Sequence, residues 1–365
     1  MTPPSPHLSK NAPTGRGPTE RTPGTALHIL GIESSCDDTA AAVLADGRVL
    51  SSVVASQDAI HQQYGGVVPE LASRSHMRSI IPVIERALAT AGVTLDDIDA
   101  VTGTCGPGLV GSLLVGLSAA KAIAFARDLP FIGVNHLEGH LLSVRLDTPV
   151  PFPYVALLVS GGHTSLYYAE DFGNYRQLGG TRDDAAGEAY DKVARVLGLG
   201  FPGGKVIDDL ARSGDRAAIR FPRARLKARR GQSPSADAPL EFSFSGLKTA
   251  VWQYVRDHAV DSDSARADVA ASFQEAVVDM LLDNSFAAVH RAGCTRLVIA
   301  GGVSANSRLR ERAQAAGAEF GVTVHIPPMR YCTDNAAMIA LAAEHRLRRG
   351  ESDPLSTNAA ADLEL

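Results

Sequence analysis

The chain has 365 residues, of which 45% are hydrophobic, 21% charged and 5% aromatic. This composition is typical of a globular protein with a sizeable core, and it excludes a disordered chain, a collagen and a disulfide-stapled mini-protein. The formal net charge is −5, so the chain lacks the overall positive charge that would indicate a nucleic-acid partner. At about 150 residues per domain, the length predicts roughly two domains.

The cysteines and the two ends of the chain give the first expectations. Cys36, Cys105, Cys294 and Cys332 stand far apart without a C-x-x-C pair, which indicates reduced thiols in a cytosolic protein. Residues 1–26 contain six prolines and no apolar run, so they predict a disordered tail and no signal peptide. Residues 349–365 predict a second disordered tail.

The predicted elements form a pattern that occurs twice. A strand at 29–32, a polar turn at 33–38 and a strand at 39–44 are matched by a strand at 155–159, a turn at 160–163 and a strand at 164–168. Later in each half, a strand (100–104, 297–300) leads through a glycine loop (106–111, 301–303) into a helix. We therefore expect two α/β halves that face each other across a cleft, with chance similarity of common α/β pieces as the alternative.

The helix after the first glycine loop is unusually apolar. Residues 109–125 carry one charge, Lys121, and fall just short of the length of a membrane span. The segment contains two glycines and has no flanking aromatic residues, which favours a helix buried inside a soluble fold.

Three glycine-rich turns follow predicted strands, at 106–111, 160–162 and 301–303. Glycine lets backbone N–H groups approach a phosphate at a helix N-terminus. The first loop reads G-x-G-x-x-G, but a dinucleotide site also needs an acid after the next strand, and Asp128 precedes that strand (131–134). The sequence contains no P-loop motif. The three loops together favour one nucleotide held between two halves, although each alone is also explained by a tight turn.

Two histidines have the spacing of metal ligands. His136 and His140 share one face of a helix, where both can hold one ion. A zinc protease places its glutamate directly after the first histidine, whereas here Glu138 comes one position later. Asp334 is a candidate third ligand, but it could instead cap the last helix. Ordinary surface histidines are the alternative for the pair.

Acidic residues cluster around a further glycine turn, at 203–204. Residues 181–184 are expected to cap a helix on which Asp191 lies off the apolar stripe, and Gly204 and Asp208 follow closely. Carboxylates beside a glycine turn suit a ribose or an amino-acid group. From periodicity alone, a solvent-facing helix surface is the favoured explanation of Asp191.

Basic residues concentrate in one stretch. Residues 212–230 hold eight basic side chains against the single acid Asp215, a net charge of +7 that leaves −12 for the rest of the chain. Pro222, Gly231 and Pro234 predict a loop. A basic loop on an acidic body is typical of a polyanion partner, with a solvated charge run as the alternative.

Nine motifs occur in order along residues 27–348. They are 31–39 (GIESSCDDT), 68–76 (VPELASRSH), 106–113 (GPGLVGSL), 135–140 (NHLEGH), 158–164 (LVSGGHT), 183–189 (DDAAGEA), 242–248 (FSFSGLK), 300–306 (AGGVSAN) and 332–335 (CTDN). This set resembles the bacterial tRNA N6-adenosine threonylcarbamoyltransferase family, once described as O-sialoglycoprotein endopeptidase-like. Three departures are Asp38 where the family commonly has Glu, Lys205 where it commonly has Pro, and a longer arginine-rich stretch.

The resemblance implies a fold and a reaction. It implies an α/β, two-lobed actin/Hsp70-like ATPase fold with duplicated subdomains, 27–132 plus 334–348 and 133–333, around a cleft. It implies transfer of the threonylcarbamoyl group of threonylcarbamoyl-AMP to N6 of the adenosine 3′-adjacent to the tRNA anticodon, with release of AMP. A cytoplasmic protein without membrane contact is expected. A metalloprotease, a kinase or ATPase of the same fold, and an inactive scaffold are the alternatives.

The resemblance also implies residue roles and partners. One ion, iron(II) or alternatively zinc, is assigned to His136, His140 and Asp334. The donor site is assigned to Leu158, Val159, Ser160, Gly161, Gly162, Asp191, Gly204, Asp208 and Asn306. Asp37 is assigned a catalytic role as a proton acceptor, although it could instead hold the water shell of the metal or cap a turn. The implied protein partners are a paralogous non-catalytic subunit and a small ATPase subunit.

Overall fold

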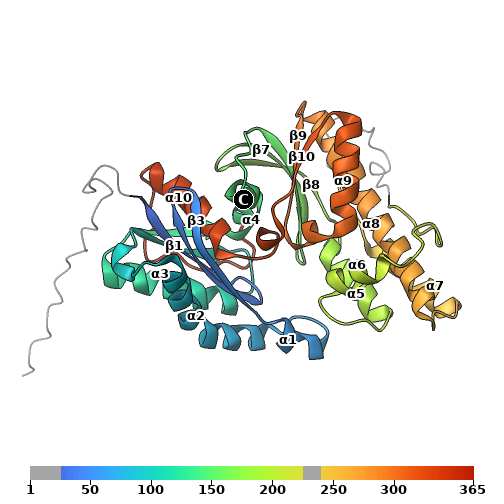
Figure 1. The fold of residues 1–365 in the computed structure, drawn as a ribbon, viewed down its shortest axis with the longest axis horizontal. Helices are drawn as coiled ribbons and strands as arrows, with labels where there is room; N and C mark the ends of the chain where they lie inside the picture. The colour runs from blue at the N-terminus through green and yellow to red at the C-terminus, as the bar shows by residue number, and fades with distance from the viewer. Residues whose placement is uncertain (1–25, 225–239) are drawn as a thin grey trace, which may run out of the picture.

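The computed structural model describes residues 26–224 and 240–365 and contains two five-stranded sheets (Figure 1). Their strand orders are β3-β2-β1-β4-β5 and β10-β9-β6-β7-β8. In each sheet an antiparallel three-stranded meander is extended by parallel strands. The predicted duplication is therefore present in the topology. The predicted tail at 1–26 lies outside the described residues except for Ala26.

The first sheet comprises β1 (His28–Glu33), β2 (Asp38–Ala45), β3 (Arg48–Ser56), β4 (Ala100–Gly106) and β5 (Phe131–Asn135). Helices α2 (Pro69–Ala91) and α3 (Val110–Arg127) cover one face, and α10 (Ala336–Arg348) covers the other. Along β1, Leu30 packs toward α2 and α3, whereas Ile29 packs toward α10. Both faces are buried, which is why the predicted strands read as continuous apolar runs. We call this sheet with its three helices the first lobe.

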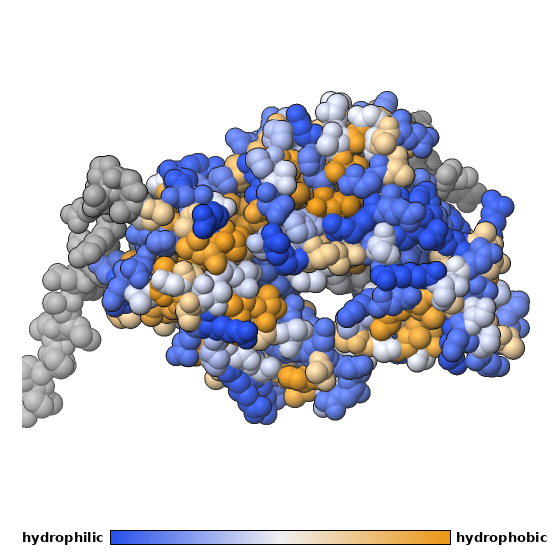
Figure 2. All heavy atoms as spheres, viewed as in Figure 1, coloured by the Kyte–Doolittle hydropathy of each residue, from blue (hydrophilic) through white to orange (hydrophobic). Residues whose placement is uncertain are grey.

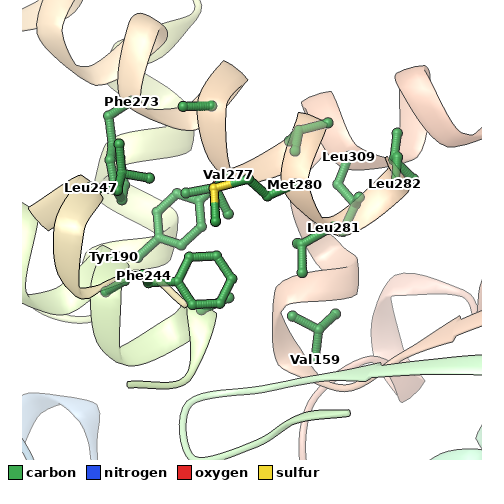
Figure 3. Packing of buried hydrophobic residues seen from close by; sticks show 14 of the residues in the cluster. Val159, Tyr190, Phe244, Leu247, Phe273, Val277, Met280, Leu281, Leu282 and Leu309 are labelled. Atoms are coloured by element: carbon green, nitrogen blue, oxygen red, sulfur yellow. The ribbon is translucent and has the colours of Figure 1, made fainter. Parts of the chain in front are cut away.

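The second sheet comprises β6 (Tyr154–Val159), β7 (Thr164–Asp171), β8 (Asn174–Gly180), β9 (Arg296–Ala300) and β10 (Thr323–His325). Its helices are α5 (Ala186–Val196), α6 (Gly203–Ala211), α7 (Ser245–Asp257), α8 (Asp263–Arg291) and α9 (Ser307–Phe320), and together they form the second lobe. The long α8 supplies the centre of the core, where Phe273 and Leu281 pack among side chains from β6, α5 and α7 (Figure 3).

Two short helices lie at the junction of the lobes. Helix α4 (His136–Leu142) contacts β5 and α10 of the first lobe and β6 and β9 of the second. Helix α1 (Asp58–His61) belongs to the connection between β3 and α2, and the loop after it reaches the second lobe, where the Arg195 guanidinium donates to the Gly65 carbonyl. Figure 2 shows the molecule hollowed between the part that carries α1 and the part that carries α5 and α6.

The predicted buried helix is α3, which packs with one face on β4 and α2. Its outer face leaves Leu114 and Phe125 exposed, and only 33% of the helix is buried, less than the sequence predicts. Among the described residues α3 is the one helix whose length and apolar character would also suit a membrane span. Its inner face packs against the sheet.

The prediction of a disordered tail at 349–365 is wrong. The Asp353 amide donates to Phe131 at 2.8 Å, and the Ala360 amide donates to Cys105 at 2.8 Å, so this segment follows the edge of the first sheet. Arg346 of α10 clamps Asp353 with bonds of 3.0 and 2.9 Å. The C-terminus lies beside α4 (Figure 1), where the side-chain amide of Asn135 donates to the Leu363 and Glu364 carbonyls. Long-range hydrogen bonds, rather than an apolar pattern, hold the segment in place.

Candidate active site

The two histidines lie on α4 as their spacing predicts. Asn135 begins this helix by accepting a hydrogen bond from the Leu137 amide at 2.8 Å. The His136 and His140 rings are both buried, with centroids 4.7 Å apart and planes at 87°. The i, i+4 spacing therefore places both imidazoles on the same side of the helix.

Asp334 joins the two histidines from the other end of the chain. Its Oδ1 lies 3.0 Å from His140 Nε2 and 3.5 Å from His136 Nε2. The helix that follows is capped by Asn335, whose side chain accepts from the Met338 amide at 3.0 Å. Asp334 is therefore not the cap, and its carboxylate is available to the histidines.

These three residues fit a metal ion. Their potential ligand atoms lie within 4.8 Å of one another, and the set consists of two imidazole nitrogens and one carboxylate oxygen. That donor set suits zinc or iron and leaves positions open for other ligands. No other group of this kind occurs within 26–224 and 240–365. The arrangement matches the assignment of His136, His140 and Asp334.

Opposite charges stabilise this cluster despite its burial. The two histidines hold the pKa of Asp334 well below its usual range, against the effect of burial. Asp334 and Glu33 raise the pKa of His136 well above its usual value, also against burial. Burial, together with the charges of His136 and His140, lowers the pKa of His163 to about 4. His163, the residue after loop 160–162, therefore interacts electrostatically with the histidine–aspartate cluster.

The three glycine loops differ in what they offer a ligand. In loop 160–162, a side chain on Gly161 or Gly162 would meet open space, so the backbone there is accessible. In loop 301–303, Gly301 has φ +92° and lies against the Val159 carbonyl, whereas Gly302 is open.

Loop 106–111 is filled by the chain itself. The Gly108 amide donates to Ala361 at 3.1 Å and the Leu109 amide to Ser35 at 2.8 Å. A Cβ on Gly108 would lie 2.5 Å from the Ser35 oxygen. The glycines here permit close packing, and the amides of Gly108 and Leu109 are already bonded within the chain, which does not favour the expectation that this loop helps to hold a nucleotide.

The residues assigned to the donor site gather on the second lobe. Leu158 and Val159 are fully buried in the core, so only their backbone can face a ligand. Asp208 accepts from the Ser307 amide and hydroxyl at 3.1 and 2.8 Å. The Asn306 side chain caps α9 by accepting from the Leu309 backbone amide at 2.9 Å, and its side-chain nitrogen donates to Gln274 Oε1 at 2.7 Å.

Asp191 lies on α5, and its side chain contacts the start of α6 instead of facing open solvent. Its Oδ1 accepts from the Gly203 amide at 2.7 Å. Burial raises its pKa to about 6, and the negative charge of Asp37 contributes. Gly204, which follows Gly203 at the start of α6, has open space around it. The helix that carries Asp191 begins at Ala186, with Ala185 as its N-cap, so residues 181–184 do not cap it directly.

Asp37 and Asp38 occupy the turn between β1 and β2. Burial raises the pKa of Asp37. Burial, Asp334 and Asp37 together raise the pKa of Asp38 to about 8. The acids of the turn therefore interact electrostatically with Asp334 and, through Asp37, with Asp191 of the second lobe. The turn lies where the two lobes meet.

Sequence reasoning missed a second carboxylate at this site, which contacts His136. Glu33 ends β1 fully buried, and its Oε2 lies 3.0 Å from His136 Nδ1. A glutamate that closes an apolar strand is the only signal for it in the sequence. Glu138, by contrast, accepts from the Tyr175 hydroxyl at 3.0 Å, on the side of α4 away from Asp334. The glutamate of a zinc protease therefore has no equivalent among these residues.

Comparison with known proteins agrees with this geometry. The family model for tRNA N6-adenosine threonylcarbamoyltransferase matches residues 48–341. A protein of that name from Anaeromyxobacter dehalogenans is 58% identical over 326 residues, covering 88% of this chain and 95% of that protein. One from Syntrophus aciditrophicus is 53% identical over 336 residues, covering 91% and 96%.

Solved structures support the fold. Full-length HypF in a phosphate- and nucleotide-bound form superposes with a TM-score of 0.60 at 13% identity, covering 88% of this chain and 46% of that one. HypF of T. kodakarensis gives 0.58 at 13% identity, covering 89% and 48%. The predicted two-lobed actin/Hsp70-like fold is confirmed. By its family match and its relatives, the chain belongs to the tRNA N6-adenosine threonylcarbamoyltransferase family.

Proposed function

We propose that this protein transfers the threonylcarbamoyl group of threonylcarbamoyl-AMP to N6 of the adenosine 3′-adjacent to the tRNA anticodon and releases AMP. The family makes it a tRNA-modifying transferase. The observation that supports the finer proposal is the cluster of His136, His140 and Asp334, which interacts electrostatically with His163, the residue that follows the open loop 160–162. A cytoplasmic location follows from the tRNA substrate.

The donor would lie along the second lobe. The exposed backbone of Gly161 and Gly162 would orient the carbamoyl and phosphate oxygens. The ribose would hydrogen-bond to Asp191 and Asp208, and the base would lie near Asn306 at the N-terminus of α9. Gly204 would leave room beside the ribose. Leu158 and Val159 would contribute backbone alone, because their side chains belong to the core.

The metal would be held by His136, His140 and Asp334, with iron(II) favoured by the resemblance and zinc as the alternative. When bound, the ion supplies a Lewis acid that polarises an oxygen of the donor. Asp37 would accept the N6 proton, directly or through water, because its raised pKa makes it a stronger base than an exposed aspartate. Both histidines are buried, so the ion would be shielded from bulk water on their side.

The tRNA would dock on the basic side of the second lobe. Arg216 and Arg220 are exposed there, whereas Arg223 pairs with Asp279 at 2.9 Å. Arg225, Lys227, Arg229 and Arg230 of the same stretch lie outside the described residues.

The paralogous subunit would bind the first lobe, where α2 exposes Met77 and Ile81 and the neighbouring α3 exposes Leu114. Exposed apolar side chains gathered on neighbouring helices are typical of a protein interface. The small ATPase subunit is proposed from the resemblance alone.

Nucleoside analysis of tRNA from cells depleted of the protein tests the proposal. We expect loss of N6-threonylcarbamoyladenosine, restoration by the wild-type gene and no restoration by His140→Ala. Unchanged modification in depleted cells would refute the function. Restoration by His140→Ala would refute the role of the metal cluster and leave the transferase assignment intact.

A further inference from the structure

A second buried carboxylate lies directly behind the metal cluster. Glu33 is fully buried at the end of β1. Its Oε1 accepts from the Ser35 amide at 2.5 Å, and its Oε2 accepts from the Thr104 hydroxyl at 2.6 Å. The same Oε2 lies 3.0 Å from His136 Nδ1. The carboxylate thus connects β1 and β4 of the first sheet to the first residue of α4.

These contacts determine which nitrogen of His136 carries the proton. An ionised carboxylate only accepts hydrogen bonds, so the contact with Glu33 Oε2 requires a hydrogen on His136 Nδ1; the Ser35 hydroxyl, 3.2 Å from the same nitrogen, can accept from it as well. The lone pair of the neutral imidazole is then on Nε2, the nitrogen that faces Asp334 at 3.5 Å. A hydrogen on Nε2 would block metal binding, so the tautomer matters.

The second histidine has no equivalent support. His140 Nδ1 is buried and has no hydrogen-bond partner within the described part of the chain. Its Nε2 also faces Asp334, at 3.0 Å. Of the two histidines, only His136 is therefore oriented by a partner on the nitrogen away from Asp334.

We propose that Glu33 is a positioning residue that holds His136 in the Nδ1–H tautomer and aims its Nε2 lone pair at the shared ion. The proposal rests on the metal site of the proposed function. Outer carboxylate partners of this kind orient ligating histidines and add negative charge near the cation, and their removal typically weakens metal affinity about 10- to 100-fold. Thr104 acts one step further out, since its hydroxyl orients the Glu33 carboxylate.

Zinc affinity of the full-length chain, measured by competition with a chromophoric chelator, tests this role without any substrate. We expect Glu33→Gln to bind Zn²⁺ about 10- to 100-fold more weakly than wild type. Glu138→Gln is the matched control, because it neutralises a partly buried carboxylate on the same helix, bonded to Tyr175 instead of His136. It should keep wild-type affinity. Thr104→Val, which retains the Glu33 carboxylate, should lose less than Glu33→Gln.

Nitrogen chemical shifts of the imidazoles in the zinc-loaded protein give a second readout. The wild type should show His136 with its hydrogen on Nδ1 and its metal-bound nitrogen as Nε2, whereas the glutamine amide of Glu33→Gln can donate to Nδ1 and should lower the population of this form. Native-like circular dichroism separates this effect from misfolding. Equal zinc affinity and an unchanged tautomer in Glu33→Gln would overturn the inference alone. A wild type that binds no Zn²⁺ would overturn both the inference and the proposed metal site.

Discussion

Replacing Asp191 with asparagine should stabilise the protein at neutral and alkaline pH but not in acid. The Asp191 carboxyl is partly buried, and burial raises its pKa from 3.8 to about 6. The folded state therefore binds this proton more tightly than the unfolded chain does. The cost of ionising the folded carboxyl grows as pH rises above about 4 and is complete above about pH 6.

The size of this cost follows from the shift. A rise of roughly two units in the pKa of Asp191, at about 1.4 kcal/mol per unit, gives a free-energy cost of about 3 kcal/mol as an upper limit. Water screens a side chain that is only partly buried, so we expect about 1–2 kcal/mol. Asparagine keeps an oxygen that can accept from the Gly203 amide, so this hydrogen bond survives the change.

Urea denaturation of both proteins at pH 8 and pH 4 measures the effect. Trp252, the single tryptophan, lies on α7, which contacts α5, so its fluorescence reports on the lobe that holds Asp191. Asp191→Asn should exceed the wild type in free energy of unfolding at pH 8 and lose most of this advantage at pH 4. The other titrating groups are common to both proteins and cancel in the comparison. A difference that does not depend on pH would refute the reasoning.

Three further outcomes are expected. His140→Ala should lower metal content, measured by elemental analysis, and transfer activity together, and full activity in a metal-free variant would contradict the proposed site. Asp353→Ala removes the partner of the Gly133 amide and of Arg346, and it should lower the free energy of unfolding by about 1–3 kcal/mol, with an unchanged denaturation midpoint as the contrary result. Gly301→Ala places a Cβ against the Val159 carbonyl at a positive φ, so it should cost about 1–2 kcal/mol or more, and wild-type thermal stability would show that the loop adapts.

The pattern of strands could be predicted from the sequence because burial on both faces produces unbroken apolar runs. Ile29–Ile32 and Val155–Val159 both show this signal. The histidine pair could be predicted because it depends only on helical spacing. In each case the information lies within a few consecutive residues.

Features that depend on distant contacts could not be predicted. The polar segment 349–365 has the composition of a disordered tail, and its order comes from hydrogen bonds to β4 and β5. Loop 106–111 has the same glycine spacing whether its amides bind a phosphate or another part of the chain. Glu33 is adjacent to His136 only because β1 and α4 meet, 103 residues apart in the sequence.

The discontinuous first lobe has a consequence for synthesis on the ribosome. The strands of its sheet are complete at Asn135, but the helix that covers one face of that sheet begins at Ala336, so roughly 200 residues must be made in between. At about 5–20 residues per second, the apolar side chains that α10 covers, Ile29 and Ile132 among them, wait on the order of 10–40 s for their partner. The second lobe is contiguous and can fold during this interval. Because Asp334 also arrives late, the growing chain can acquire a folded lobe before it can form a complete metal site.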